Sequence, residues 1–131
     1  MIKNFREWHN KKETINERTD IKDIFFREKE VWWCSLGVNV GFEQDGKGQE
    51  FRRPILILKK FNQYALLIAP LTTKIKKDNK YYVPCELDDG IERMIIISQL
   101  RLIDTKRLID KLGVLKKESF DIIKKAIKHM I

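Results

Sequence analysis

The sequence predicts a mainly β protein with α-helices, folded as a small curled antiparallel barrel of about five strands. Short runs of β-branched and aromatic residues recur along the chain with turn residues between them, and one amphipathic helix ends the sequence. Short strands joined by turns and followed by a terminal helix favour such a barrel. The five expected strands are Val31–Leu36, Ile55–Leu58, Tyr64–Ala69, Lys80–Leu87 and Arg93–Ile103.

Residues 1–26 are expected to form a helical extension to a domain that spans residues 27–131. Phe5, Trp8 and Ile15 recur near helical spacing with charged residues between them, which predicts a helix over about residues 3–18. Its N-terminal cap is expected to be poor. The sequence leaves open whether this extension covers a binding groove, extends a dimer or engages a protein partner.

Two adjacent tryptophans, Trp32 and Trp33, lie in the first expected strand. Neighbouring side chains in a strand point to opposite faces, so only one of the two enters the core. The other is expected to meet a subunit interface, the N-terminal helix or a surface on which bases stack. After this strand, Gly37–Phe51 contains four glycines and predicts a long loop.

The second half of the chain supplies the remaining elements. Pro84 predicts that its strand lies at a sheet edge, and Asp104 is expected to cap a short turn that ends at Leu108. Residues 112–115 are expected to lead into the last helix. That helix has a poor N-terminal cap at Lys116, and one apolar face made of Phe120, Ile123, Ile127 and Met130.

The composition indicates a basic, single-domain protein. Its 131 residues include 27 Lys and Arg against 19 Asp and Glu. Within residues 52–80 there are 8 basic side chains and one acid, Asp78, which is typical of a protein that binds a polyanion. No apolar run is long enough to span a membrane and no secretory signal opens the chain, so the cytoplasm is expected.

Metal and disulfide chemistry are not expected from the cysteines. Cys34 and Cys85 fall inside expected strands and lack the spacing of a metal motif, which predicts two buried free thiols. No cofactor is expected either.

The strongest local prediction is a hairpin. Ile55–Leu58 and Tyr64–Ala69 are separated by a short Phe-Asn-Gln connection, so antiparallel pairing is expected. In such a pair the start of one strand lies beside the end of the other. Arg53 and Thr72 should therefore be neighbours at one rim of the sheet, among cations, which predicts a phosphate site.

Four short motifs in order, together with the segment Lys106–Leu115, resemble the MazF/PemK family of endoribonuclease toxins from bacterial type II toxin–antitoxin pairs. The motifs are GxEQ at Gly41, Glu43 and Gln44, RPIL at Arg53–Leu56, APLT at Ala69–Thr72, and QLRLID at Gln99–Asp104. The resemblance covers about residues 28–131.

The resemblance implies an SH3-like barrel that forms a symmetric homodimer with an RNA groove along its interface. It implies metal-independent cleavage of single-stranded RNA to a 2′,3′-cyclic phosphate and a 5′-hydroxyl, and inhibition by a cognate antitoxin. Arg53 and Thr72 match the family's catalytic pair, and Glu43 is the best remaining candidate for a base. The expected RNA contacts are Gln44, Thr73, Lys74, Lys76, Lys77, Gln99 and Arg101.

The chain departs from the family pattern at three places. The loop at residues 45–52 is longer than usual, Phe42 stands where a small or polar residue is common, and Ser98 replaces an acidic residue. The longer loop and Ser98 keep an alternative open, namely a non-cleaving nucleic-acid binder, or a module that poisons a protein target, on the same barrel. A purely structural interaction domain is a third possibility.

Overall fold

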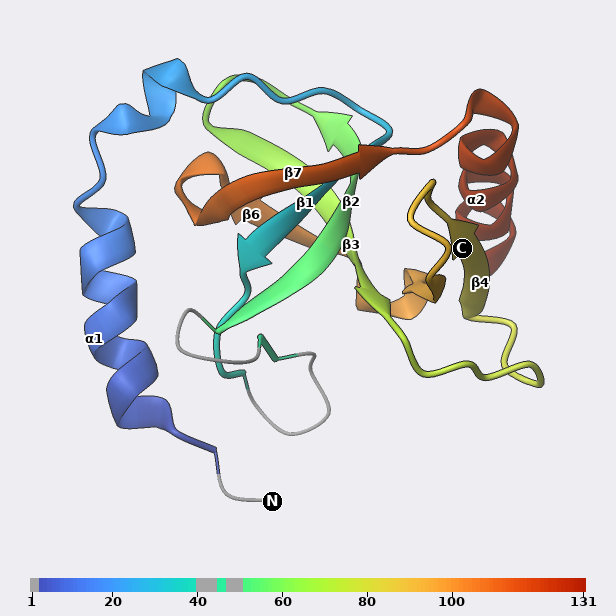
Figure 1. The fold of residues 1–131 in the computed structure, drawn as a ribbon, viewed down its shortest axis with the longest axis horizontal. Coiled ribbons are helices and arrows are strands. Elements are labelled where there is room, and N and C mark those ends of the chain that lie inside the picture. The colour runs from blue at the N-terminus through green and yellow to red at the C-terminus, as the bar shows by residue number, and fades with distance from the viewer. Residues whose placement is uncertain (1–2, 40–44, 47–50) are drawn as a thin grey trace.

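The computed structural model describes residues 3–39, 45–46 and 51–131. It is mainly β with two α-helices, α1 and α2, which lie at opposite ends of the molecule (Figure 1). The elements in chain order are α1 (Phe5–Asn16), η1 (Asp20–Asp23), β1 (Glu30–Ser35), β2 (Arg52–Lys60), β3 (Ala65–Thr72), β4 (Tyr82–Glu86), β5 (Glu92–Ile96), η2 (Ile97–Gln99), β6 (Arg101–Asp104), η3 (Thr105–Arg107), β7 (Leu108–Val114) and α2 (Lys117–Met130).

The strands form one curled antiparallel sheet in which β3 is central. The order is β4-β5-β3-β2-β1-β7, an open path, with β6 paired to β3 outside it. β3 pairs with β2 along one side. On its other side the first half of β3 pairs with β6, whereas Leu71 and Thr72 pair with Ile95 and Met94 of β5. This change of partner curls the sheet and holds the end of β3 between two neighbours.

The expected fold class is confirmed, but the described chain has seven strands instead of about five. The run Arg93–Ile103, expected to be one strand, is divided by η2 into β5 and β6. The two strands pair with different ends of β3, and the turn carries the chain from one end to the other. Residues 112–115 belong largely to β7, which sequence analysis missed because Asp110 and Lys111 are exposed and interrupt any apolar pattern.

Several local predictions hold. The N-terminal helix is present as α1, Pro84 lies on the edge strand β4, and the Asp104 side chain accepts the Lys106 amide, 2.8 Å away. Lys116 makes no side-chain cap for α2. The expectation of a poor cap for α1 was wrong, because the helix begins at Phe5 and the side chain of Asn4 accepts the amide of Glu7 at 3.1 Å.

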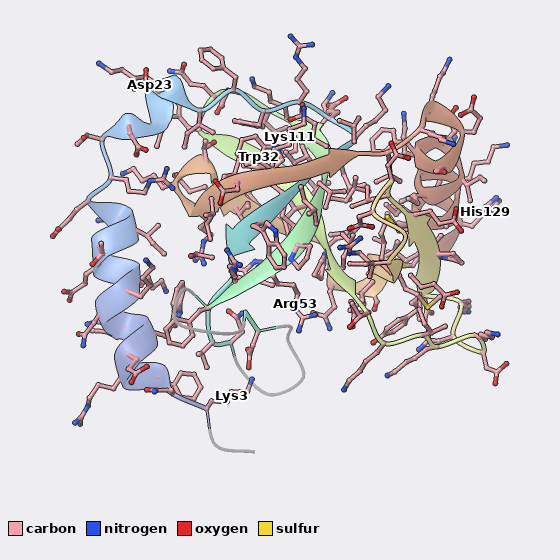
Figure 2. The ribbon with its side chains drawn as sticks, viewed as in Figure 1. Lys3, Asp23, Trp32, Arg53, Lys111 and His129 are labelled. Carbon is pink, nitrogen blue, oxygen red and sulfur yellow. The ribbon has the colours of Figure 1, made fainter. Side chains whose placement is uncertain are left out.

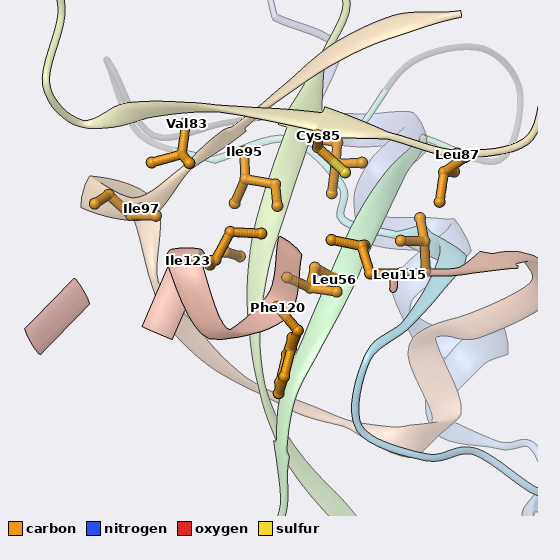
Figure 3. Close-up of a cluster of buried hydrophobic side chains, with 12 residues drawn as sticks. Leu56, Val83, Cys85, Leu87, Ile95, Ile97, Leu115, Phe120 and Ile123 are labelled. Atoms are coloured by element: carbon orange, nitrogen blue, oxygen red, sulfur yellow. The ribbon is translucent and has the colours of Figure 1, made fainter. Parts of the chain in front are cut away.

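Apolar side chains fill both faces of the sheet. Leu56 belongs to a cluster on one face, and Phe120 and Ile123 of α2 cover it (Figure 3). Ile55 and Ile57 alternate to the other face, where they pack with Phe26, Trp32, Cys34, Leu36, Leu66, Ile68, Ile103 and Leu108. Cys34 and Cys85 are buried free thiols, as predicted. Within the described residues, no helix has the length and apolar character needed to cross a membrane.

Candidate active site

The predicted hairpin brings Arg53 and Thr72 to one rim of the sheet. Ile55 of β2 pairs with Pro70 of β3 in antiparallel register, and the same register continued by two residues sets Arg53 opposite Thr72. Both side chains are half-buried. The sequence prediction that the two residues are neighbours is therefore confirmed, while their chemical roles are taken up below.

Two main-chain carbonyls orient the Arg53 guanidinium. Its Nε donates to the carbonyl of Asp45 at 2.8 Å, and its Nη1 donates to the carbonyl of Leu71 at 3.0 Å. Burial lowers the pKa of Arg53 from its usual value, and the Asp45 carboxylate partly offsets this effect. A guanidinium has five N–H groups and stays charged in proteins. Two of them fix its plane here, and the others make no hydrogen bond with the described residues, so they can donate to a ligand.

The Thr72 hydroxyl is oriented by the turn that follows β3. Its Oγ1 accepts the backbone amide of Lys74 at 3.1 Å. Since the oxygen is engaged as an acceptor, the hydroxyl proton is available for donation to a ligand. Thr72 therefore presents a donor beside Arg53.

Arg53 and Thr72 line a groove of about 550 Å³ that is rich in cations. Its other lining residues are Trp33, Arg52, Pro54, Leu71, Thr73, Lys74, Ile91 and Arg93. Four of these ten residues are Arg or Lys, and none is Asp or Glu. Guanidinium and ammonium groups beside a hydroxyl donor are suited to a phosphodiester.

The two tryptophans of β1 take the separate positions that strand alternation requires. Trp32 is in the core, and its indole N–H donates to Glu30 at 3.0 Å. Trp33 lines the groove, with the Arg52 guanidinium 4.5 Å from its ring centre. Trp33 is therefore at the groove and its ring meets the Arg52 guanidinium, while the base-stacking surface and the subunit interface expected for the second tryptophan stay predictions.

The predicted RNA contacts do not all lie at this groove. Thr73 and Lys74 line it. Lys77 lines a neighbouring pocket of about 340 Å³, and Lys76 lies 4.9 Å from the ring centre of Tyr82, which lines the same pocket. The other predicted contacts are placed as follows: Gln99 in η2 and Arg101 in β6 are outside the groove lining, and Glu43 and Gln44 fall outside the described residues.

Arg101 instead contacts the segment between β1 and β2. Its Nη1 lies 3.5 Å from the side-chain oxygen of Asn39. It is half-buried at the start of β6. In the described structure Arg101 therefore contacts the chain just after β1, and its expected role in binding RNA stays a prediction.

Sequence analysis missed Arg93. Its side chain is 6% exposed and forms a two-point ion pair with Asp89, with contacts of 2.8 and 2.9 Å. The hydrogen bond from Arg93 lowers the pKa of the Asp89 carboxyl. Arg93 reaches the groove because β5 pairs with the end of β3, and that pairing leaves no local signal in the sequence.

Among the residues that the structure describes, no group of three or more His, Cys, Asp and Glu side chains is arranged to hold a metal ion. The charges at the groove are those of Arg and Lys. Such groups can donate hydrogen bonds and stabilise negative charge.

Comparison with known proteins gives consistent matches. Residues 27–131 match the model of a family described as PemK-like, MazF-like toxin of type II toxin–antitoxin system. Endoribonuclease EndoA of Bacillus subtilis (strain 168) is 32% identical over 115 residues, which is 80% of this chain and 93% of that protein.

Solved structures share the fold at lower identity. The crystal structure of MazF from Deinococcus radiodurans superposes with a TM-score of 0.67 at 17% identity, covering 82% of this chain and 97% of that one. A mycobacterial endoribonuclease, solved in complex with its cognate antitoxin, gives 0.60 at 16% identity, covering 80% and 93%. At these identities the likeness concerns the fold.

Proposed function

This chain belongs to the PemK-like, MazF-like toxin family of type II toxin–antitoxin systems, and we propose that it is a metal-independent, sequence-specific endoribonuclease that cuts single-stranded RNA. The observation that carries the proposal is the Arg53–Thr72 pair in a groove lined by cations. The similarity to a protein named endoribonuclease adds support.

The proposed reaction is attack of a ribose 2′-hydroxyl on the adjacent phosphorus. The new bond joins the 2′-oxygen to phosphorus, and the bond from phosphorus to the 5′-oxygen breaks. The products are a 2′,3′-cyclic phosphate and a 5′-hydroxyl. The 2′-hydroxyl must lose a proton, the phosphorane gathers negative charge on its equatorial oxygens, and the 5′-oxygen must gain a proton.

Arg53 is proposed to stabilise the charge of the phosphorane. Its guanidinium is held at Nε and Nη1 before any substrate binds, so its remaining N–H groups need little reorganisation. A planar fork can also donate two bonds to one phosphate, which a lysine ammonium cannot match in geometry.

Thr72 is proposed to donate its hydroxyl proton to the phosphate or to the 2′-oxygen. A hydroxyl is a poor base near neutral pH, and its oxygen already accepts the Lys74 amide. Proton removal therefore falls to another group. Glu43 is our candidate on sequence grounds alone, because it lies in the GxEQ motif.

The predicted RNA contacts extend from the groove along the chain. We assign Thr73 and Lys74 to the phosphate next to the cut, and Lys76 and Lys77 to flanking phosphates. The remaining assignments, which rest on the sequence motifs, are base or phosphate contacts for Gln44, Gln99 and Arg101.

The same proposal includes the protein's partners. We expect a symmetric homodimer in the cytoplasm, inhibited by a cognate antitoxin whose acidic segment fills the basic groove. Residues 27–131 are the toxin domain in this proposal and residues 1–26 are an extension to it. No metal ion or other cofactor is required.

An RNA with one cleavage site tests the chemistry. In EDTA we expect discrete cuts that leave 2′,3′-cyclic phosphate and 5′-hydroxyl ends. A 2′-deoxy nucleotide on the 5′ side of the cut should abolish cleavage of that bond while binding persists, because only the nucleophile is lost. Cleavage of the deoxy-substituted RNA, or 5′-phosphate ends, would contradict the mechanism. RNA that is bound in a salt-sensitive way but never cut would favour the non-cleaving binding module.

A further inference from the structure

Trp8 of α1 packs on the two ends of the segment between β1 and β2. The residue is 5% exposed, and its ring centre lies 5.4 Å from that of Phe51, just before β2. At the other end Gly37 has a φ of 85°, and a Cβ there would overlap the Trp8 ring. The Gly37 amide donates to the Phe51 carbonyl at 3.0 Å, so the two ends of the segment are joined to each other and Trp8 packs on both.

Lys3, just before α1, binds the same segment farther along. Its Nζ lies 3.2 Å from Oδ2 of Asp45 and donates to the Asn39 carbonyl at 2.6 Å. The Lys3 and Asp45 side chains are only 12% and 23% exposed. An ion pair shielded in this way is worth more than an exposed one, because water screens it less.

Asp45 connects this ion pair to the guanidinium at the groove. Its carboxylate accepts the Asn39 amide at 2.7 Å, while its carbonyl accepts from Arg53 Nε at 2.8 Å. The next residue, Gly46, donates its amide to the Gly37 carbonyl at 2.6 Å, beside Trp8. Both contacts of the extension therefore act on the peptide unit that orients Arg53.

We propose that Lys3 and Trp8 are positioning residues for Arg53, and that they act through the peptide unit between Asp45 and Gly46. The inference rests on the proposed ribonuclease function, to which it adds a role for the N-terminal extension. In Figure 2, Lys3 and Arg53 both lie in the lower half of the view, whereas His129 of α2 is at the right-hand end.

This role differs from covering the groove, one of the possibilities that the sequence left open. No described residue of α1 is among the groove's lining residues. The extension instead contacts the Asp45 carboxylate through Lys3, whereas Arg53 binds the carbonyl of the same residue. Losing the Lys3 contact removes no groove side chain, but it loosens the Asp45 carbonyl that fixes Arg53 Nε.

The test compares four full-length proteins: wild type, Lys3→Met, Lys3→Arg and Lys12→Met. Lys3→Met removes the ion pair, and Lys3→Arg keeps it. Lys12 is exposed on α1, so Lys12→Met removes the same charge without touching Asp45. Two quantities are measured for each protein, namely RNA cleavage in EDTA and the solvent exchange rate of the Arg53 Nε–H by NMR.

Lys3→Met should lower kcat about 10- to 100-fold with little change in KM, since the misplaced group acts in the transition state. Its Arg53 Nε–H should exchange about tenfold faster or more, as expected on loss of one charge-assisted hydrogen bond. Lys3→Arg should restore both values, and Lys12→Met should leave both at the wild-type level.

The outcomes separate the two proposals. If Lys3→Met and Lys12→Met match in both measurements, the positioning role is overturned. If wild type cuts no RNA but Lys3→Met still accelerates Nε–H exchange, the positioning role stands and the ribonuclease proposal fails. Trp8→Ala supplies a second variant at the other contact, and it should change both quantities in the same direction, with Trp8→Phe intermediate.

Discussion

Replacing Gly37 by alanine tests whether the Trp8 ring of α1 packs directly on Gly37. The left-handed backbone at this position costs about 1–2 kcal/mol for any residue with a Cβ, and the φ of Gly37 is 85°. The added methyl would also overlap the Trp8 ring, and overpacking of this kind costs about 1–3 kcal/mol. Gly37→Ala should therefore lower the free energy of unfolding by about 2–5 kcal/mol.

A double-mutant cycle separates these two costs. Trp8→Ala alone should cost about 3–5 kcal/mol. It also removes the ring that the methyl strikes, so Gly37→Ala with Trp8→Ala should be less destabilised than the sum by about 1–3 kcal/mol. Gly90 is the matched control, because its φ is 73° but a Cβ there meets nothing within 4 Å. Gly90→Ala should cost only the backbone term and add to Trp8→Ala.

The free energy of unfolding in urea is measured by far-UV circular dichroism, which does not rely on tryptophan emission. The six proteins are wild type, Gly37→Ala, Gly90→Ala, Trp8→Ala and the two double variants that combine Trp8→Ala with each glycine change. Additive costs for Gly37→Ala and Trp8→Ala would show that the Trp8 ring does not lie on Gly37. Equal costs for Gly37→Ala and Gly90→Ala would show the same. Either result would also remove one of the two contacts, Lys3 and Trp8, through which the N-terminal extension is proposed to position Arg53.

Three further predictions concern the cores and the groove. Burial raises the pKa of Cys34 to about 12 and that of Cys85 to about 11, so neither thiol should react with a disulfide reagent at about pH 8 until urea unfolds the protein; reaction of the native protein would contradict this burial. Burial alone would raise the pKa of Glu30, but hydrogen bonds from Trp32, Lys111 and the Arg27 amide together lower it. Because the pKa of Glu30 is lowered in the folded protein, its ionised form stabilises the fold at pH values above the ordinary pKa of 4.5, and this contribution disappears as the pH falls through the folded pKa. In Glu30→Gln the free energy of unfolding in urea should therefore fall less between about pH 5 and pH 3 than it does in wild type. An equal fall in both proteins would refute this role of Glu30. Lys74→Ala should weaken RNA binding and reduce the slope of log Kd against log salt by about 0.7 to 1, whereas Lys128→Ala, an exposed change on α2, should do neither; equal effects would mean that the groove is not the RNA site.

The hairpin was predictable because its information is local. Two apolar runs with a short connection fix an antiparallel register, and the register places Arg53 opposite Thr72. The terminal helix was predictable for a similar reason, since its apolar face repeats at helical spacing and packs through Phe120 and Ile123. In both cases residues close in sequence determine the structure.

The rest of the site depends on pairings between distant residues. β7 is half exposed and its charged residues hide the alternation, so only its pairing with β1 reveals it. Arg93 reaches the groove because β5 pairs with the end of β3. The contact between Lys3 and Asp45 joins the extension to a segment that has no pattern of its own, so no local signal identifies it.

The central claim is that Arg53 and Thr72 form a catalytic pair, and single-turnover cleavage of single-stranded RNA in EDTA tests it most directly. Arg53→Ala and Thr72→Val should each lower the rate by roughly 10²–10³-fold, as for loss of one preorganised donor. Arg27→Ala, an exposed change of the same type outside the groove, should cut at the wild-type rate. Cleavage by Arg53→Ala at the wild-type rate would contradict the account.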